Sequence, residues 1–300
     1  MNLWVDTDYG FDDLWALLLL RHYGIRPAGL SLVAGNVPLP QVIANAGGAA
    51  QAYGLDMPVH AGADRPLVRT PETAERILGP TGMPTRGRCL PEVAGFAPPD
   101  DGVSALGAWL RQGDDPKVVL ALGPLTNIAE LIAQHPQAAR RITRLVWMGG
   151  SAGAGNHSPL AEFNALADPE ALHRVAASGI AMDVVDLEMC RQIRFDPQDL
   201  PDCDPLSADL LGGYLDIALT RGRKDMAIYD PTAAMAVVRP EAFEFAPMAV
   251  EVSITADATY GATRFTPDPS SRLRLAMRAR GNLAADCLAV FSKGADNGLS

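Results

Sequence analysis

The stretch MNLWVDTDYGFDDLWALLLL, residues 1–20, sets the fold class of the chain. An apolar run at residues 3–6 ends in a polar turn, and the turn leads into a helical apolar periodicity at residues 12–23. A short apolar run followed by a helix is the repeating unit of parallel sheets that are covered on both faces. The turn crowds together four carboxylates: Asp6, Asp8, Asp12 and Asp13. Buried carboxylates repel one another, so we expect something positive beside them.

The same alternation continues to residue 185. Further apolar runs predict strands at residues 29–34, 58–60, 117–122, 143–148 and 181–185. Helical periodicity between them predicts helices at residues 39–53, 103–112, 125–134 and 169–177. This order predicts an α/β fold, with a single domain over residues 1–300 built on a doubly wound, mostly parallel sheet.

The rest of the chain has other patterns. Residues 65–99 are rich in Gly and Pro with little apolar periodicity, which predicts a long loop or lid over the site. After Leu206 the pattern turns helical, with two strand-like runs at residues 248–256 and 264–266 and a closing helix at residues 283–291. We therefore expect a helical C-terminal part.

Composition limits the partners of the chain. Of its 300 residues, 48% are hydrophobic, which suffices for a sizeable core, and its formal net charge is -10. The acidic balance argues against nucleic acid and anionic membranes, because phosphate binding needs clustered Lys and Arg. No apolar run reaches the ~18 residues of a membrane span. The first residues lack the basic and apolar pattern of a signal peptide, so we expect a cytoplasmic protein.

The cysteines are widely spaced and form no CxxC pair, which predicts neither a zinc cage nor a disulfide framework. Cysteine is among the residue types most often buried. We expect buried free thiols at Cys89, Cys190, Cys203 and Cys287.

Polar segments follow four of the predicted strands, at the end where open α/β sheets bind ligands. They are DTDYGFDD, then Gly35 and Asn36, then GPLTN, then GGSAGAGNHSPLAEFN. Oxygen ligands without a nearby His or Cys suit Ca²⁺ or Mg²⁺. Asp12 or Asp13 can also cap a helix that begins at Leu14, but capping accounts for only one of the four aspartates.

Two later segments offer further polar groups. Asn156, Glu162 and Asn164 lie in GNHSPLAEFN, and such groups can bind a polyol because each hydroxyl both donates and accepts. The same residues could instead form a polar surface loop. Asp230, between Tyr229 and a buried helical pattern, is either the N-cap of that helix or a distant fourth carboxylate for a cation.

These segments resemble, in their order, the motifs of the nucleoside hydrolases, the inosine-uridine-preferring ribohydrolase family. DTDYGFDD is similar to the signature DTDPGxDD, with Tyr9 in place of the usual Pro. VAGN at residues 33–36, LGPLTNIAE at 122–130, MGG followed by GNHSPLAEFN, and YDP at 229–231 look like the later motifs. The resemblance covers most of the chain. It implies Ca²⁺-dependent hydrolysis of the N-glycosidic bond of a ribonucleoside, giving ribose and free base.

The resemblance also implies a role for each matching residue. Asp8, Asp13, Asp230 and the backbone carbonyl of Leu122 would hold Ca²⁺, and a metal-bound water would attack the anomeric carbon. Asp8 would take the proton of that water, while Asp6 would support the metal loop from behind. Five residues would bind the ribose: Asp12, Asn36, Asn156, Glu162 and Asn164. Because relatives are often dimers or tetramers, we expect a homodimer or homotetramer.

The chain differs from the family at the positions that assist the departure of the base. Family members often have a His directly before the late Asp and another before a loop Gly, and these positions are Tyr229 and Leu78 here. Tyr229 could donate a hydrogen bond, stack on the base or simply pack beside the helix. Arg221 and Arg223 could lie over the base or form a solvated face, and His157 could be a donor or an ordinary loop residue. We predict that all four tryptophans are buried: Trp4, Trp15, Trp109 and Trp147.

Three other interpretations stay open at this point. A haloacid-dehalogenase-type phosphatase would use Asp6 and Asp8 as its DxD pair, but it leaves LGPLTN and AEFN unexplained. A nucleoside or ribose binding protein with lost catalysis would bind its ligand without releasing base. A hydrolase of another N-riboside would need the same anionic ribose pocket.

Overall fold

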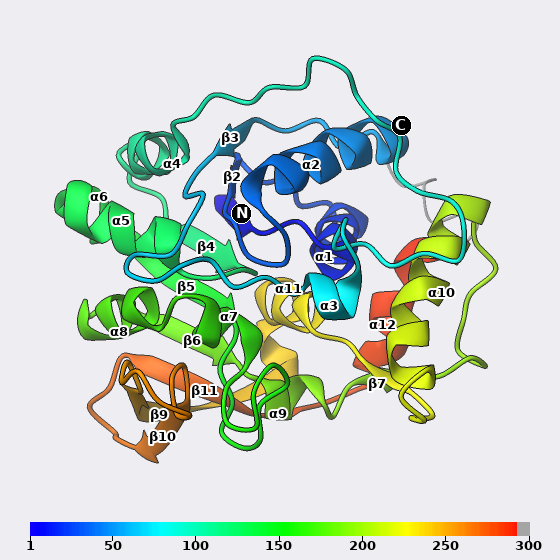
Figure 1. Cartoon of the computed structure of the whole chain (residues 1–300). Helices are drawn as coiled ribbons and strands as arrows, with labels where there is room; N and C mark the ends of the chain where they lie inside the picture. Colours follow the sequence, from blue (N-terminus) through cyan, green and yellow to red (C-terminus); the bar gives the residue numbers. More distant parts are fainter. Residues whose placement is uncertain (293–300) are drawn as a thin grey trace.

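The fold is built on one sheet, with the strand order β10-β9-β11-β6-β5-β4-β1-β2-β3 in the computed structural model of the protein. The structure describes residues 1–292. Parallel pairing joins β3 (Val59–Ala61), β2 (Leu30–Leu32), β1 (Leu3–Thr7), β4 (Lys117–Ala121), β5 (Ile142–Met148), β6 (Met182–Val185) and β11 (Leu273–Ala279). The antiparallel strands β9 (Phe243–Val252) and β10 (Thr263–Pro267) complete the edge that lies away from β3 (Figure 1).

Side chains of the parallel strands alternate between two cores, one on each face of the sheet. Trp4 of β1 and Val119 of β4 belong to one core, whereas Val5 and Leu120 belong to the other. The first core is covered by α4 (Gly102–Leu110), α5 (Thr126–Gln134), α6 (Pro136–Ala139) and α8 (Pro169–Ala177). The second is covered by α1 (Phe11–His22), α2 (Leu39–Tyr53), α10 (Pro205–Leu219), α11 (Asp230–Val238) and α12 (Leu283–Leu288). Burial on both faces explains why these strands are apolar at successive positions.

Short elements connect the main ones. They are α3 (Glu75–Leu78), α7 (Phe163–Ala167), α9 (Leu187–Cys190), the antiparallel pair β7 (Arg194–Phe195) and β8 (Met226–Ala227), and 3₁₀ turns at Pro240–Ala242 and Ala289–Phe291. Across residues 1–292, no helix is both long enough and apolar enough to cross a bilayer.

The first two-thirds of the chain follow the sequence prediction. All the strands predicted up to residue 185 are present, and α2 and α8 have the predicted bounds. The doubly wound, mostly parallel α/β fold is therefore confirmed. The four tryptophans are buried, as predicted.

The predicted helical C-terminal part is present as α10, α11 and α12, but the strands in this part of the chain differ from the prediction. β9 begins at Phe243 instead of residue 248, and β11 has no counterpart in the prediction. β11 lies between β6 and β9, with Leu273 and Leu275 buried and Arg274 paired with Asp183. Its sequence alternates leucine with arginine, and it becomes a strand by pairing with segments that are distant in the chain, which no local pattern encodes.

Two helix starts also differ from the prediction. α1 begins at Phe11, one residue before the predicted helix at 12–23 and three before the start at Leu14 that the capping interpretation assumes, so Asp12 and Asp13 lie within its first turn. α11 begins at Asp230 itself, and the residue at its N-cap is Tyr229. The N-cap interpretation of Asp230 is therefore wrong, and its carboxylate lies elsewhere, in the cluster described below.

The segment at residues 65–99 contains α3 and is fastened to the body of the protein. The N–H of Leu67 donates to Asp168 (2.9 Å), and the guanidinium of Arg69 lies 3.3 Å from the centre of the Tyr260 ring. The role of this segment as a lid stays a prediction.

The expectation of four buried thiols is wrong. Cys190 and Cys287 are buried, but Cys203 is half-buried and Cys89 is exposed, because it lies in the polar part of the 65–99 segment. Within residues 1–292, none of the four forms a disulfide.

Candidate active site

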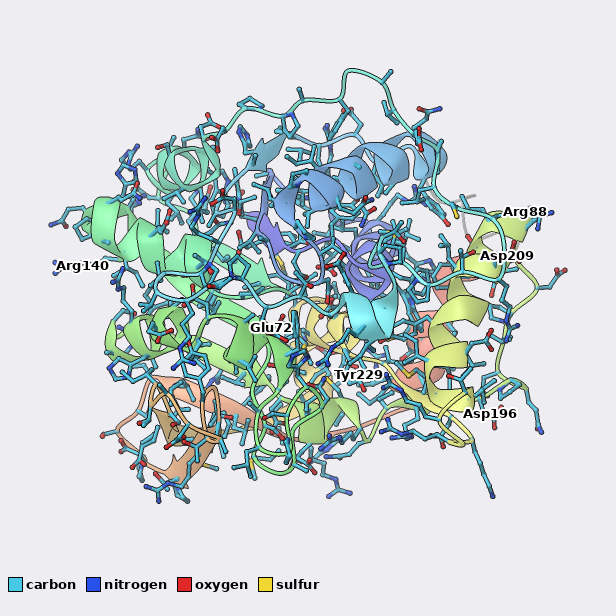
Figure 2. All side chains as sticks on the ribbon, viewed as in Figure 1. Glu72, Arg88, Arg140, Asp196, Asp209 and Tyr229 are labelled. Atoms are coloured by element: carbon cyan, nitrogen blue, oxygen red, sulfur yellow. The ribbon has the colours of Figure 1, made fainter. Side chains whose placement is uncertain are left out.

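The carboxyl ends of β1, β2, β4 and β5 open into a cavity of about 360 Å³. Most of the predicted site residues line it: Asp12, Asn36, Leu122, Asn156, Glu162, Asn164, Tyr229 and Asp230. In the view of Figure 2, Tyr229 and Glu72 are labelled near the centre of the picture, whereas Arg140 and Asp196 are labelled at its periphery. The strand ends therefore bring together side chains that are far apart in the sequence.

Three carboxylates, called the cavity floor below, lie together here: Asp12 and Asp230 line the cavity, and Asp13 lies beside them without lining it. Oxygens of Asp12, Asp13 and Asp230 lie within 4.8 Å of one another, and Asp13 and Asp230 are buried. Burial raises the pKa of all three, to about 7 for Asp12, where repulsion from Asp13 adds to the effect. Ionising such a group is costly unless a cation lies among the oxygens. A donor set made only of oxygens fits a hard divalent cation.

The turn before α1 holds Asp13 in place. Asp13 accepts the N–H of Gly10 (2.7 Å) and the hydroxyl of Thr7 (2.5 Å). Between them, Tyr9 has a φ of +44°, and its N–H donates to Thr7 Oγ1 (3.1 Å). A non-glycine residue in the left-handed region is strained, and such strain is typical of functional sites.

Asp8 lies next to the floor carboxylates. Asn36 donates its backbone N–H to Asp8 Oδ2 (2.6 Å) and its amide Nδ2 to Oδ1 (3.1 Å). Two glycines make room for it, since a Cβ at Gly35 would lie 2.2 Å from Asp8 Oδ2 and one at Gly123 would lie 3.1 Å from Asp8 Cβ. Burial, followed by repulsion from Asp13, raises the pKa of Asp8. The VAGN and LGPL segments thus shape the pocket around this carboxylate.

Asp6 is buried next to the turn and outside the cavity wall. It accepts hydrogen bonds from the hydroxyl of Ser31 and from Nδ2 of Asn127 (2.8 Å). Asn127 Nδ2 also donates to the carbonyl of Leu32 (3.0 Å), so these contacts link β1, β2 and α5. Burial raises the pKa of Asp6 to about 7.

Glu162 caps α7 from inside the protein. Its carboxylate accepts the N–H groups of Asn164 (2.8 Å), Ala165 (3.0 Å) and Gly150 (2.8 Å). Burial nevertheless raises its pKa to about 7. Glu162 and Asn164 are buried and only Asn156 is exposed, so the interpretation as a polar surface loop is wrong for the first two.

Asn164 connects the ends of β4 and β5. Its Nδ2 donates to the carbonyls of Leu122 (2.7 Å) and Met148 (3.0 Å). Both donors of the amide are therefore used, and its oxygen is the atom left for a ligand. Asn156 Oδ1 accepts the N–H of Phe163 (3.0 Å), the first residue of α7, and so fixes the start of this helix.

Two tyrosines line the cavity. The buried Tyr214, from α10, donates its hydroxyl to Asp12 Oδ2 (3.2 Å). Tyr229 is half-buried, and burial raises its pKa to about 12, so its phenol keeps its proton at neutral pH. The sequence analysis missed Tyr214 because an aromatic residue in an apolar helix has the pattern of an ordinary core residue.

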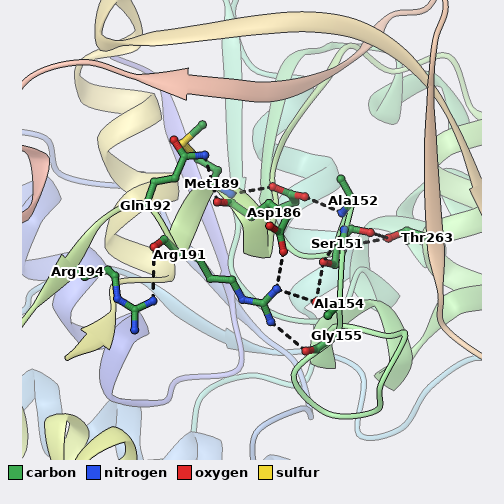
Figure 3. A network of polar contacts seen from close by, with 12 residues as sticks. Ser151, Ala152, Ala154, Gly155, Asp186, Met189, Arg191, Gln192, Arg194 and Thr263 are labelled. Atoms are coloured by element: carbon green, nitrogen blue, oxygen red, sulfur yellow. Dashed lines mark hydrogen bonds and ion pairs between the residues drawn. The ribbon is translucent and has the colours of Figure 1, made fainter. Parts of the chain in front are cut away.

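A polar network fixes the loop that leads to Asn156 (Figure 3). The guanidinium of Arg191 donates to the carbonyls of Ala154 (2.8 Å) and Gly155 (2.9 Å) and pairs with Glu188 (2.5 Å). Arg191 also lines the cavity, and the sequence analysis did not single it out. One side chain thus joins α9 to the loop that follows β5.

His157 connects the same loop to the 65–99 segment. Its Nε2 lies 2.9 Å from Oε1 of Glu72, and its ring centre lies 5.2 Å from that of Phe163. Its Nδ1 is buried and, among residues 1–292, has no hydrogen-bond partner.

Comparisons with known proteins agree with this geometry. The family model described as "Inosine-uridine preferring nucleoside hydrolase" matches residues 3–284. The pyrimidine-specific ribonucleoside hydrolase RihA of Shewanella baltica (strain OS185) is 32% identical over 270 residues, which cover 86% of this chain and 84% of that protein. The non-specific ribonucleoside hydrolase RihC of Escherichia coli O127:H6 is 34% identical over 278 residues, which cover 88% and 87%.

A solved structure shows the same fold. The purine-preferring ribonucleoside hydrolase from Gardnerella vaginalis superposes with a TM-score of 0.86 at 21% identity, covering 97% of this chain and 99% of its own. The family match over nearly the whole chain sets aside the phosphatase alternative. This chain therefore belongs to the inosine-uridine preferring nucleoside hydrolase family and is an N-glycosidase that hydrolyses ribonucleosides.

Proposed function

We propose that this hydrolase works with a Ca²⁺ ion at the cavity floor. The observation that carries the proposal is the convergence of the Asp12, Asp13 and Asp230 oxygens within 4.8 Å. Asp8, Asp13, Asp230 and the backbone carbonyl of Leu122 would hold the ion, and Asp12 lies close enough to contribute. A cation bound there would lower the pKa of a water molecule toward neutrality.

In this proposal, the remaining steps belong to the protein's own groups. Asp8, held by two donors from Asn36, accepts the proton of the attacking water. The ribose hydroxyls are bound by Asp12, Asn36, Asn156, Glu162 and Asn164, which positions the anomeric carbon. Positive charge develops on the ribose as the N-glycosidic bond breaks, and the carboxylates of the site stabilise it.

We assign to Tyr229 the role of hydrogen-bond donor to the departing base. This residue lines the cavity beside Asp230, and its raised pKa of about 12 supports a role as a hydrogen-bond donor. The phenol would donate to the base as the base accumulates negative charge.

The test is the release of reducing sugar from a panel of purine, pyrimidine and modified ribonucleosides. We expect release from at least one of them, and we expect Asp8→Ala and exhaustive chelation each to abolish it. Asp56→Ala is the matched control, because Asp56 is an exposed aspartate that pairs with Arg26 on the surface. Activity that survives both treatments would reject the metal mechanism. Tight nucleoside binding without any sugar release would favour the binding-protein alternative.

We further propose that the enzyme is a cytoplasmic homodimer or homotetramer. This proposal rests on the membership of the family. Light scattering after size-exclusion chromatography would give the mass directly, and a monomer would contradict it.

A further inference from the structure

Four arginines line one cavity in a chain that has more acidic than basic residues, 35 against 25. Arg191 and Arg194 are paired, with Glu188 and Asp225 respectively. Arg221 and Arg223 differ from them, because both are exposed and neither side chain forms an ion pair or hydrogen bond within the described part of the chain. Unpaired cations on the wall of a site are the groups that an anionic ligand would meet.

The unpaired arginines lie at the end of the cavity where we place the base. They belong to the connection between α10 and β8, and Ile217, in the last turn of α10, lines the cavity with them. The charges of Arg191 and Arg223 both act on the Tyr229 hydroxyl, which places these guanidinium groups near the group assigned to the base. The floor carboxylates lie at the ribose, so the cavity is anionic at one part and cationic at another.

We propose that Arg221 and Arg223 select ribosides whose base carries a negative charge, as a carboxylate or an ionised oxo group. This inference rests on the proposed function and names its substrate class. Guanidinium groups form charge-assisted, often bidentate hydrogen bonds with such groups, and a neutral base offers no equivalent partner.

The same arginines stabilise the leaving group in the bond-breaking step. The N-glycosidic bond breaks with its electron pair going to the base nitrogen, while the water oxygen forms a bond to the anomeric carbon and the water proton goes to Asp8. The base therefore leaves with one more negative charge, shared with the Tyr229 hydrogen bond and the two guanidinium groups, and it takes its proton from solvent after release. Positive groups placed where this charge develops lower the barrier.

The experiment compares ribose release from matched pairs that differ in a carboxylate: nicotinic acid riboside against nicotinamide riboside, and orotidine against uridine. We expect the wild type to have a higher kcat/KM for the carboxylate member of at least one pair. Arg221→Gln and Arg223→Gln should each lower this ratio by roughly fivefold, the size expected of a solvent-exposed ion pair. Added salt should lower the ratio as well. Lys224→Gln, an exposed neighbour outside the cavity wall, is the control and should leave the ratio unchanged.

Four outcomes would overturn the inference or the proposed function on which it rests. A wild type without preference in either pair, or a double Arg221→Gln/Arg223→Gln variant with an unchanged ratio, would refute it and leave the hydrolase proposal intact. Faster cleavage of a nucleoside 5′-monophosphate than of its nucleoside, lost in the same double variant, would place the anion on the ribose and overturn the assignment to the base. No sugar release from any riboside would refute the proposed function itself. Unchanged circular dichroism and Tm would show that the variants fold.

Discussion

Tyr229 precedes Asp230 directly, so the group that we assign to the base is tied to a carboxylate of the cavity floor. We predict that Tyr229→Phe lowers kcat by about 10²-fold on a nucleoside with a poor leaving base, because losing one hydrogen-bond donor to a developing anion costs at least that much. A p-nitrophenyl riboside, whose leaving group is a stable anion without such a hydrogen bond, should keep its rate. Steady-state kinetics on the two substrates measures the difference.

Tyr229→Ala is the companion variant. If the ring also stacks on the base, the Ala variant should have a higher KM for the nucleoside than the Phe variant, since only Phe keeps the ring. Equal losses of kcat on the nucleoside and on the p-nitrophenyl riboside in the Phe variant would remove Tyr229 as the hydrogen-bond donor to the base.

Glu162 links stability to pH. Burial raises its pKa in the folded protein from 4.5 to about 7. Between these values the folded state keeps a proton that the unfolded state has lost, so the free energy of unfolding falls as the pH rises from about 4.5 to 7. In Glu162→Gln we predict that the free energy of unfolding falls less over this pH range than in the wild type, by a difference on the order of 3 kcal/mol. Urea unfolding between pH 5 and 8 measures it, with the exposed Glu92→Gln as control. Parallel curves for the wild type and Glu162→Gln would contradict the prediction.

At the scale of elements, local sequence patterns predict a strand well when it is followed along the chain by the helix that packs with it. β1 and α1 form one strand-turn-helix unit within 22 residues, and the apolar run followed by helical periodicity identifies both. β11 depends instead on β6 and β9, which bury Leu273 and Leu275 from either side. Its arginines make the segment look polar when it is considered alone.

The same distinction holds for the site. Asp8 and Asn36 follow strands, so their position in the sequence predicts that they lie at the ligand-binding edge. Tyr214 and Arg191 reach the cavity from α10 and from the end of α9, where the sequence pattern indicates only a buried or exposed helix face. Side chains that enter a site from a covering helix have no such marker.

Arg191 joins α9 to the loop of Asn156, which we propose to bind the ribose. Arg191→Lys keeps the charge but loses the fork that donates to the carbonyls of Ala154 and Gly155, so we predict a looser Asn156 loop and a KM about tenfold higher. We expect kcat to change much less, and kinetics with one good substrate measures both. Glu188→Gln is the matched variant, because it removes the ion pair and leaves the carbonyl contacts. A Glu188→Gln variant as impaired as Arg191→Lys would show that the ion pair, and not the clamp, holds the loop.

At the scale of the whole molecule, the cavity floor joins residues that are more than 200 positions apart in the chain. Asp12 and Asp13 lie in the first turn of α1, and Asp230 begins α11, which packs against α1 in the core below. The carboxylates therefore come together only when the complete domain is folded. A cation that binds them stabilises the native state and has no equivalent site in the unfolded chain.

We therefore predict that Ca²⁺ raises the Tm of the chelator-treated protein. At a free concentration 100 times Kd, binding adds about 2.7 kcal/mol to the free energy of unfolding, which corresponds to a rise of roughly 4 °C for a domain of this size. Asp230→Asn should lose this rise, yet without Ca²⁺ it should be at least as stable as the wild type, because one of the mutually repelling carboxylates is gone. Asp56→Asn should keep the rise. Calorimetry with and without Ca²⁺ measures all three proteins, and a rise that persists in Asp230→Asn would place the ion elsewhere, because the site proposed here cannot form without that carboxylate.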